Sequence, residues 1–406
     1  MLPKRHHTVV GLDIGTTKIC ALVAEMSGDR VNIIGVGVHP SDGLRKGVVI
    51  DLDSTVNSIK RAVEEAERSS GVRITSVVTG IAGGHIKSFN TTASISLSTY
   101  EVTQRDVERV QEMARSVAVP MDREVIQTEV QEYWLDDQGG IKDPVGMSGK
   151  NLSVYLHVVT AAVASAQNLI KAANLAGLDV EDIVLQPLAS GKAVLGEEET
   201  ELGVALADFG GGTTDLAFYH NGTVRHTSVL PLGGDNLTYD LAAVLRVPKS
   251  EAERLKVTYG ICHKSYLDSA KQIEISDLGG WSTKQLTQEK ILQILEPRVT
   301  EIFTLLHEEI QQRGFKDRIH MGIVLTGGSS ILPGMLEKAE EIFGLPVRVG
   351  YPRGILGSEA VSSPMYATAV GLVLHASHLG RKVRKFSRKQ GNLFFRLLDT
   401  MKKWFK

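Results

Sequence analysis

The stretch LGVALADFGGGTTDLAFY, residues 202–219, holds two apolar runs joined by three glycines and two threonines. This pattern predicts a buried strand, a tight turn and a returning strand. A shorter version, GLDIGTTK, stands at residues 11–18, and the aspartates of the two versions, Asp13 and Asp208, are 195 residues apart. One strand–turn–strand unit used twice predicts two similar lobes that face each other.

Both turns have the composition of an anion-binding loop. Glycine lets backbone N–H groups approach an anion closely, and threonine hydroxyls add donors. The aspartates at the strand ends, Asp13 and Asp208, are placed to hold Mg²⁺ or its waters rather than the phosphate itself. One such turn alone is more often an ordinary β-turn, but two in matching contexts favour a phosphate site. Neither turn has the spacing of a dinucleotide-binding or P-loop motif, which excludes those two sites.

Three further segments can complete a nucleotide site. IVLTGGSS, residues 323–330, predicts a buried strand ending in a turn where backbone can pack on a flat base or ribose. LGGD, residues 232–235, opens a helix expected over 236–245. On the next helix, Glu253 could accept from ribose hydroxyls and the stem of Lys256 could cover the base. Such a pair, three residues apart, is more often an ordinary solvated pair.

Length and composition predict a folded chain of several subdomains. At 406 residues the chain is too long for one compact core, and 42% of it is apolar. Two distant cysteines exclude a disulfide scaffold and a multi-cysteine metal site. We expect no signal peptide and no transmembrane segment. The expected elements are a β-meander over 9–50, helices over 54–69, 103–117 and 165–176, and a polar loop over 136–150 within a module inserted at about 84–159.

The C-terminal segment differs in charge from the rest of the chain. Residues 381–406 carry ten basic side chains and one acidic side chain, whereas the other 380 residues have a net charge of −11. Over 391–406, apolar side chains recur at helical spacing with basic ones opposite, which predicts an amphipathic helix that lies in a membrane interface. The residues assigned to the membrane are Leu393, Phe394, Leu397, Leu398, Met401, Lys402, Lys403, Trp404 and Phe405.

Two other roles for this segment stay open. It could dock on its own body or in a partner groove, or its charges could meet nucleic acid, which the apolar stripe would serve poorly. Burial of seven large side chains gives roughly 7 kcal/mol, and the cost of ordering the segment is similar. One tail should therefore bind a membrane weakly, and several tails on one polymer should bind well.

Taken together, the motifs resemble the actin-like ATPases and, among them, the FtsA family of bacterial division proteins. The resemblance covers nearly the whole chain and rests on GLDIGTTK, LADFGGGTTDLA, LPLGGDNLT, AERLK, LEPRVTEI, VLTGGSS, the inserted module and the basic end. It implies an α/β, actin-like two-lobed fold of duplicated ribonuclease-H-like domains, with an inserted α+β subdomain and a C-terminal amphipathic helix. It also implies a cleft for ATP and Mg²⁺ between the lobes.

The resemblance assigns roles to residues around this cleft. Gln186 falls where the superfamily places the residue that orients the attacking water. An amide cannot take the proton of that water, so we expect slow or absent ATP hydrolysis, with ATP as a structural and polymerisation ligand. Lys18 could reach phosphate or lie on the surface of its strand. The assigned nucleotide residues are Asp13, Gly15, Thr16, Thr17, Lys18, Asp208, Gly210, Gly211, Gly212, Thr213, Thr214, Gly233, Gly234, Asp235, Glu253, Lys256, Gly327, Gly328 and Ser329.

The resemblance also implies a division of the chain. The first lobe would comprise 1–83, 163–198 and 357–378, with the inserted subdomain over 84–162. The second lobe would comprise 199–229 and 303–356, with an outer subdomain over 230–302. A basic linker over 379–390 and the membrane helix over 391–406 would complete the chain.

The implied function is to tether FtsZ filaments to the cytoplasmic face of the inner membrane at the division site, as a peripheral protein that binds anionic lipid and no nucleic acid. Actin-like self-assembly and recruitment of later division proteins through the inserted subdomain would accompany it. Lys290 and Arg298, around ILQILEPRVTEI, could receive the acidic tail peptide of FtsZ, although such residues more often belong to a solvated helix face. The alternative is a sugar-kinase-like phosphotransferase that uses the same cleft. We interpret His375 and His378 as helix-surface residues rather than metal ligands.

Overall fold

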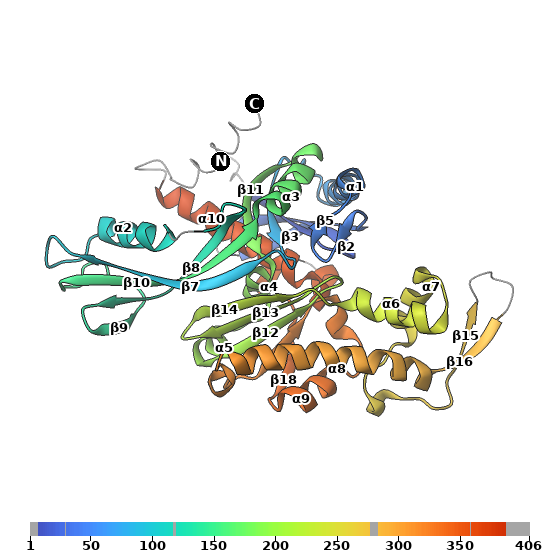
Figure 1. Cartoon of the computed structure of the whole chain (residues 1–406). Helices are drawn as coiled ribbons and strands as arrows, with labels where there is room; N and C mark the ends of the chain where they lie inside the picture. Colours follow the sequence, from blue (N-terminus) through green and yellow to red (C-terminus); the bar gives the residue numbers. More distant parts are fainter. Residues whose placement is uncertain (1–6, 29, 117–118, 277–282, 358, 387–406) are drawn as a thin grey trace.

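The computed structural model of the chain describes residues 7–28, 30–116, 119–276, 283–357 and 359–386, and three larger sheets organise them (Figure 1). The first sheet has the strand order β11-β6-β1-β2-β3-β19. Its strands are β1 (His7–Ile14), β2 (Lys18–Ser27), β3 (Arg30–Pro40), β6 (Ser76–Ile81), β11 (Asp179–Leu185) and β19 (Ile355–Leu356). The second sheet has the order β14-β13-β12-β17-β18. Its strands are β12 (Val204–Phe209), β13 (Thr214–His220), β14 (Thr223–Leu230), β17 (Ile323–Thr326) and β18 (Val347–Val349).

The two sheets share one topology. β1 and β12 each pair antiparallel with the strand that follows and parallel with a strand reached by a longer connection, β6 or β17. In the second sheet the turn between β13 and β14 has both Asn221 and Gly222 at positive φ, 55° and 72°, as a tight hairpin turn requires. The repeated unit read from the sequence therefore belongs to two similar lobes.

Helices cover these sheets. In the first lobe they are α1 (Leu52–Ser70), α3 (Val163–Leu175), α4 (Gln186–Val194) and α10 (Ala367–Phe386), with a small hairpin of β4 (Leu44–Arg45) and β5 (Val48–Val49). In the second lobe they are α5 (Glu197–Leu202), α6 (Gly234–Leu245), α7 (Lys249–Tyr259), α8 (Gln288–Gln312) and α9 (Met335–Phe343), with an outer hairpin of β15 (Gln272–Ser276) and β16 (Thr283–Thr287).

Local sequence explains where α1 begins and ends. The Asp51 carboxylate accepts a hydrogen bond of 3.1 Å from the Ser54 N–H at the N-terminus, and Gly71 ends the helix at a φ of 69°. A Cβ on Gly37 of β3 would lie 1.9 Å from the Ala62 carbonyl oxygen, so the helix packs directly on the strand backbone. The helix predicted over 54–69 is confirmed.

The inserted module forms the third sheet, of order β7-β10-β8-β9, with its own apolar core against α2 (Figure 1). Its elements are β7 (Lys87–Ser96), α2 (Gln104–Arg115), β8 (Arg123–Leu135), β9 (Gln138–Ile141) and β10 (Asn151–Ala162). The prediction of a loop over 136–150 is wrong for β9, which pairs with β8. A Cβ on Gly139 would lie 2.3 Å from the Trp134 ring, so this strand depends on a side chain of its neighbour.

The C-terminal part of the described chain also differs from expectation. α10 continues to Phe386, so the helix includes residues 379–386 of the segment predicted as a linker, as the high helix propensity of Arg and Lys favours. The predicted amphipathic helix over 391–406, with its membrane residues, lies outside the described residues. β19 falls within the predicted second lobe but pairs with β3 of the first lobe. α8 runs unbroken across position 302, where the outer subdomain was predicted to end. The proposed domain boundaries stay predictions. Among the described residues, no helix is long and apolar enough to cross a membrane.

Candidate functional site

A cavity of about 480 Å³ lies where the two strand–turn–strand units face each other. The structure brings together fifteen of the nineteen predicted nucleotide residues in its lining. They are Asp13, Gly15, Thr16, Thr17, Lys18, Asp208, Gly210, Gly211, Gly212, Thr213, Glu253, Lys256, Gly327, Gly328 and Ser329. Gln186, at the start of α4, also lines the cavity.

The two turns have the same backbone closure and nearly touch. Gly15 N–H donates to the Lys18 carbonyl at 3.1 Å, and Gly210 N–H donates to the Thr213 carbonyl at 3.0 Å. A Cβ on Gly211 would lie 1.8 Å from the Thr17 hydroxyl oxygen. Gly211 and Gly212 are therefore needed because they meet Thr17 and Thr16 of the first lobe with little room for a side chain.

The carboxylate of Asp13 is held by two neighbours in its own lobe. It accepts from the Lys18 ammonium at 3.3 Å and from the Gln186 amide at 3.3 Å. Burial acts to lower the pKa of Lys18, but the charge and hydrogen bond of Asp13, together with Cys20 and Tyr366, outweigh it and raise that pKa above its usual value. The ammonium also lies over the Tyr366 ring, 5.4 Å from its centre. Lys18 thus lies in the cavity wall rather than on the outer surface of its strand, and its contact with phosphate stays a prediction.

In the second lobe two carboxylates are buried side by side. Burial raises the pKa of Asp208 to about 6, and the Thr368 hydroxyl of α10 donates to this group at 3.1 Å. Burial, with the Asp208 charge, raises the pKa of Asp215 well above its usual value. Thr213 donates to one oxygen of Asp215, and the other oxygen has no hydrogen-bond partner in the described chain. The sequence analysis did not assign Asp215 or Thr368 to the site, although both line the cavity.

Residues of α6 and α7 also line the cavity. Lys256 forms an ion pair of 2.7 Å with Glu253, and its ammonium donates to the Gly234 carbonyl at 3.1 Å. With 14% of its side chain exposed, Lys256 is not an ordinary surface lysine. The pair therefore belongs to the cavity wall.

Four predicted residues support the cavity without lining it. The N–H groups of Gly234 and Asp235 donate to the Gly210 and Gly211 carbonyls at 3.0 and 2.7 Å. Thr214, which is fully buried, donates to the Leu232 carbonyl. Gly233, Gly234 and Asp235 thus hold the glycine turn from behind.

Apolar side chains that the sequence analysis missed complete the wall. They are Ile14, Leu237, Val257, Ile331, Leu332, Pro333 and Met365. Val257 is 73% exposed and Ile331 is 56% exposed, which is unusual for apolar residues beside polar ones. A cavity lined both by apolar side chains and by polar, glycine-rich turns suits a ligand with a flat ring and an anionic group. Val257 follows Lys256 in the sequence, and Ile331 follows the Gly-Gly-Ser-Ser turn. Their position next to predicted site residues is the sequence signal that could have identified them.

The residues present fit a cation only together with a ligand. The described part of the chain has no group of three His, Cys, Asp or Glu side chains that could hold an ion. Asp13 and Asp208, from different lobes, line one cavity. Mg²⁺ typically uses one or two carboxylates with phosphate oxygens and waters, which matches two carboxylates better than a closed protein site does.

Three other residues singled out in the sequence lie elsewhere. Arg298 on α8 binds both oxygens of Asp240, at 2.7 and 3.1 Å, and also contacts Glu301. Lys290 is exposed near the start of the same helix. His375 on α10 has 15% of its side chain exposed, and its ring bridges the Asp182 carboxylate at 2.8 Å and Lys192 at 2.7 Å.

Comparison with known proteins adds two family matches and close relatives. The family described as "Cell division protein FtsA" matches residues 205–371, and the "SHS2 domain inserted in FTSA" matches residues 83–160. The FtsA protein of Pseudomonas aeruginosa is 44% identical over 369 residues, which is 90% of this chain and 88% of that protein. The FtsA protein of Escherichia coli K12 is 39% identical over 411 residues, 98% of each chain.

Solved structures resemble the fold at lower identity. A PilM–PilN type IV pilus biogenesis complex aligns with a TM-score of 0.65 and 18% identity, over 91% of this chain and 98% of that one. MreB 5 of Spiroplasma citri bound to AMPPNP aligns with a TM-score of 0.57 and 16% identity, over 94% and 99%. With the inserted SHS2 domain, these matches confirm the predicted actin-like fold and its insertion.

Proposed function

The chain belongs to the FtsA family of cell-division proteins, and from this membership we propose that it binds ATP with Mg²⁺ between its lobes and acts as a membrane-tethered scaffold. The observation that carries the nucleotide site is the contact between the two turns, one from each lobe, in the wall of a cavity that apolar side chains also line. MreB 5, a structure of similar fold, is described as bound to AMPPNP, which supports the same choice of ligand.

In this proposal the phosphate chain lies between the two turns. Backbone N–H groups and the hydroxyls of Thr16, Thr17 and Thr213 would bind its oxygens, and Lys18 would add a positive charge. Asp13 and Asp208 would hold Mg²⁺ through water, and the ion would neutralise phosphate charge. The Glu253–Lys256 pair and the apolar wall would receive the nucleoside.

Turnover would be slow, because the group placed to orient water is an amide. Gln186 donates to Asp13, so its position is fixed by the same carboxylate that faces the cation. Asp215 is the one observation that favours the alternative of a phosphotransferase, since its unpartnered oxygen could act as a base. A coupled kinase assay with small-molecule acceptors separates the two functions. Transfer of phosphate to an acceptor would contradict the scaffold function.

The wider role follows from the family and from the C-terminal sequence. We propose that residues 391–406 hold the protein on the cytoplasmic face of the inner membrane, with weak single tails made effective by actin-like filaments. The second lobe would bind the FtsZ tail peptide, and the inserted subdomain would recruit later division proteins.

Flotation with anionic vesicles tests the tether. Phe405→Glu places a charge on the apolar stripe and should abolish flotation. Phe395→Glu adds the same charge off the stripe and should retain most of it. Equal flotation of the two variants would contradict a stripe that lies in the membrane. Titration of ATP with and without Mg²⁺ tests the cleft independently.

A further inference from the structure

The two segments that carry the chain between the lobes lie side by side. Residues 195–203, which include α5, lead from α4 of the first lobe to β12 of the second. Residues 350–354 return the chain from β18 to β19. The Arg353 N–H donates to the Ala193 carbonyl at 2.9 Å, which ties the returning segment to the end of α4. Any relative motion of the lobes must bend these two segments.

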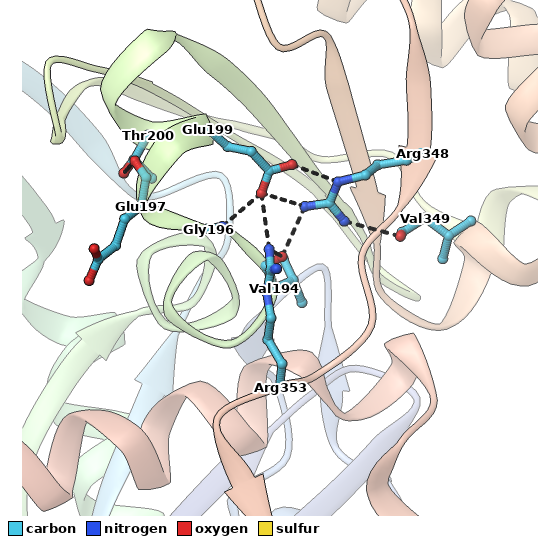
Figure 2. A network of polar contacts seen from close by, with 8 residues as sticks. All are labelled: Val194, Gly196, Glu197, Glu199, Thr200, Arg348, Val349 and Arg353. Carbon is cyan, nitrogen blue, oxygen red and sulfur yellow. Dashed lines mark hydrogen bonds and ion pairs between the residues drawn. The ribbon is translucent and has the colours of Figure 1, made fainter. Parts of the chain in front are cut away.

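One carboxylate joins both segments. Glu199 on α5 lies between two guanidinium groups (Figure 2). Arg348 of β18 binds it with two hydrogen bonds of 2.7 Å each, and Arg353 of the returning segment binds it at 3.0 Å. The paired geometry of Arg348 is the strong form of an arginine–carboxylate contact. Burial acts to raise the pKa of Glu199, but the arginines and the Gly196 N–H outweigh it and lower that pKa.

Both arginines also bind the end of α4. The carbonyl of Val194, the last residue of that helix, accepts from Arg348 at 3.0 Å and from Arg353. Positive groups at a helix C-terminus meet unpaired carbonyls and the negative end of the helix dipole. Each arginine therefore joins the second-lobe carboxylate to a first-lobe helix end (Figure 2).

The helix at this junction also reaches the cavity. α4 begins with Gln186, which lines the cavity and donates to Asp13, and it ends with Val194. A Cβ on Gly371 of α10 would lie 1.8 Å from the Ala189 carbonyl, so α4 is in backbone contact with α10 along its middle. Because α4 and α10 pack this closely, α4 has little freedom to bend. We therefore expect a displacement of Val194 at one end of α4 to move Gln186 at the other end.

We propose that Glu199, Arg348 and Arg353 form a clamp that fixes the interlobe hinge and, through α4, sets how firmly the lobes close on a ligand. The clamp itself stands on the contacts above, and its effect on ligand affinity rests on the proposed nucleotide site. The proposal predicts that substitutions in the clamp, whose residues do not line the cavity, weaken the binding of a ligand in the cavity.

Hydrogen exchange of the intact chain without ligand tests the clamp. Glu199→Gln leaves two guanidinium groups without their carboxylate and should speed amide exchange over 194–203 and 347–354 by about tenfold. Glu198→Gln removes the same charge from an exposed neighbour on α5 and should change this exchange little. Unchanged exchange in a folded Glu199→Gln protein would overturn the clamp.

A milder pair of variants covers the case in which Glu199→Gln does not fold. Arg353→Met keeps the Arg348–Glu199 pair and should speed exchange by a few-fold, whereas Arg348→Lys keeps the charge and loses the paired geometry. If the three residues act as one unit, the effects of Arg353→Met and Arg348→Lys should not add. Additive effects would contradict the proposal that the three residues act as one unit.

Titration of a non-hydrolysable ATP analogue tests the link to the cavity. Glu199→Gln should weaken binding about five- to tenfold, mainly through faster dissociation, while Glu198→Gln should bind as the unaltered protein does. Faster exchange with unchanged affinity would overturn the link through α4. Failure of the unaltered protein to bind the analogue would overturn the proposed nucleotide site, and the exchange result would still decide on the clamp.

Discussion

The ring of His157 in the inserted subdomain lies 2.9 Å from the Thr227 hydroxyl on the edge strand of the second lobe. Asn90 holds the other ring nitrogen at 2.7 Å, and Ser88 donates to the Thr227 carbonyl at 2.7 Å. Gln131 donates to the Val224 carbonyl at 3.0 Å. The inserted subdomain is joined to the first lobe at both of its ends. This polar contact is therefore a second junction between the lobes, separate from the hinge.

Stability should fall on acidification because of this histidine. His157 is 1% exposed, and burial, with the nearby His226, lowers its pKa to about 3. The unfolded chain binds this proton near pH 6.5 and the folded chain does not, so stability is lost as pH falls below that value. At pH 5 the loss from this group is about 2 kcal/mol relative to pH 7.

Chemical denaturation of the unaltered protein and of His157→Gln between pH 5 and 7.5 checks this expectation. The variant should lose much of the pH dependence. His378→Gln, at an exposed position on α10, should keep it. The same slope in His157→Gln would mean that another group controls the acid response.

Gly211→Ala should prevent closure of the cleft. The new methyl group would lie 1.8 Å from the Thr17 hydroxyl, so the turns must separate. We expect affinity for ATP to fall by tenfold or more, or about 1.4 kcal/mol, with little loss of secondary structure. Gly84→Ala is the matched control, since the nearest atom to its methyl group would be 3.8 Å away. Unimpaired binding by Gly211→Ala, measured by titration, would contradict a site between the turns.

Thr368→Val should weaken binding of ATP in the presence of Mg²⁺. It removes the hydroxyl that donates to Asp208 and keeps the shape of the side chain. We expect a loss of about 1 kcal/mol, the usual effect of one hydrogen bond to a buried group. Thr368→Ser retains the hydroxyl and should bind nearly normally. If both variants bind alike, the hydroxyl does not position Asp208.

The two basic residues of α8 should respond differently to substitution. Arg298 is already neutralised by Asp240 and Glu301, so Arg298→Gln should mainly lower the free energy of unfolding, by about 1 kcal/mol. Lys290 is exposed and should contribute more to binding an acidic FtsZ tail peptide. Fluorescence anisotropy with the labelled peptide checks this, and a larger loss of affinity in Arg298→Gln than in Lys290→Gln would reverse the assignment.

What the sequence could predict depended on how local each signal was. The turns at Gly15 and Gly211 were predictable because apolar runs and turn residues are adjacent in the chain. The β9 strand was not, because a pairing with β8 and the packing of Trp134 on Gly139 stabilise it rather than its own composition.

Contacts between distant residues were beyond one sequence. Glu199 and Arg348 are 149 positions apart, and neither belongs to a motif. His375 looked like a surface residue because its partner, Asp182, is 193 positions away. Gly234 was assigned to the nucleotide site with its motif, but it does not line the cavity, and its supporting role behind Gly210 depends on a backbone contact that no spacing reveals.

The shared strand order of the two sheets makes the two turns nearly two-fold symmetric, with Gly15 and Gly210 in equivalent places. Symmetry of that kind cannot tell one direction of a phosphate chain from the other. In the second lobe α6 and α7 follow the third strand, whereas only β4 and β5 stand at the equivalent place in the first. If the proposed nucleotide site holds, the polarity of the nucleotide would be set by the part of the cleft that was not duplicated, and base selectivity could change there without altering the contacts to phosphate.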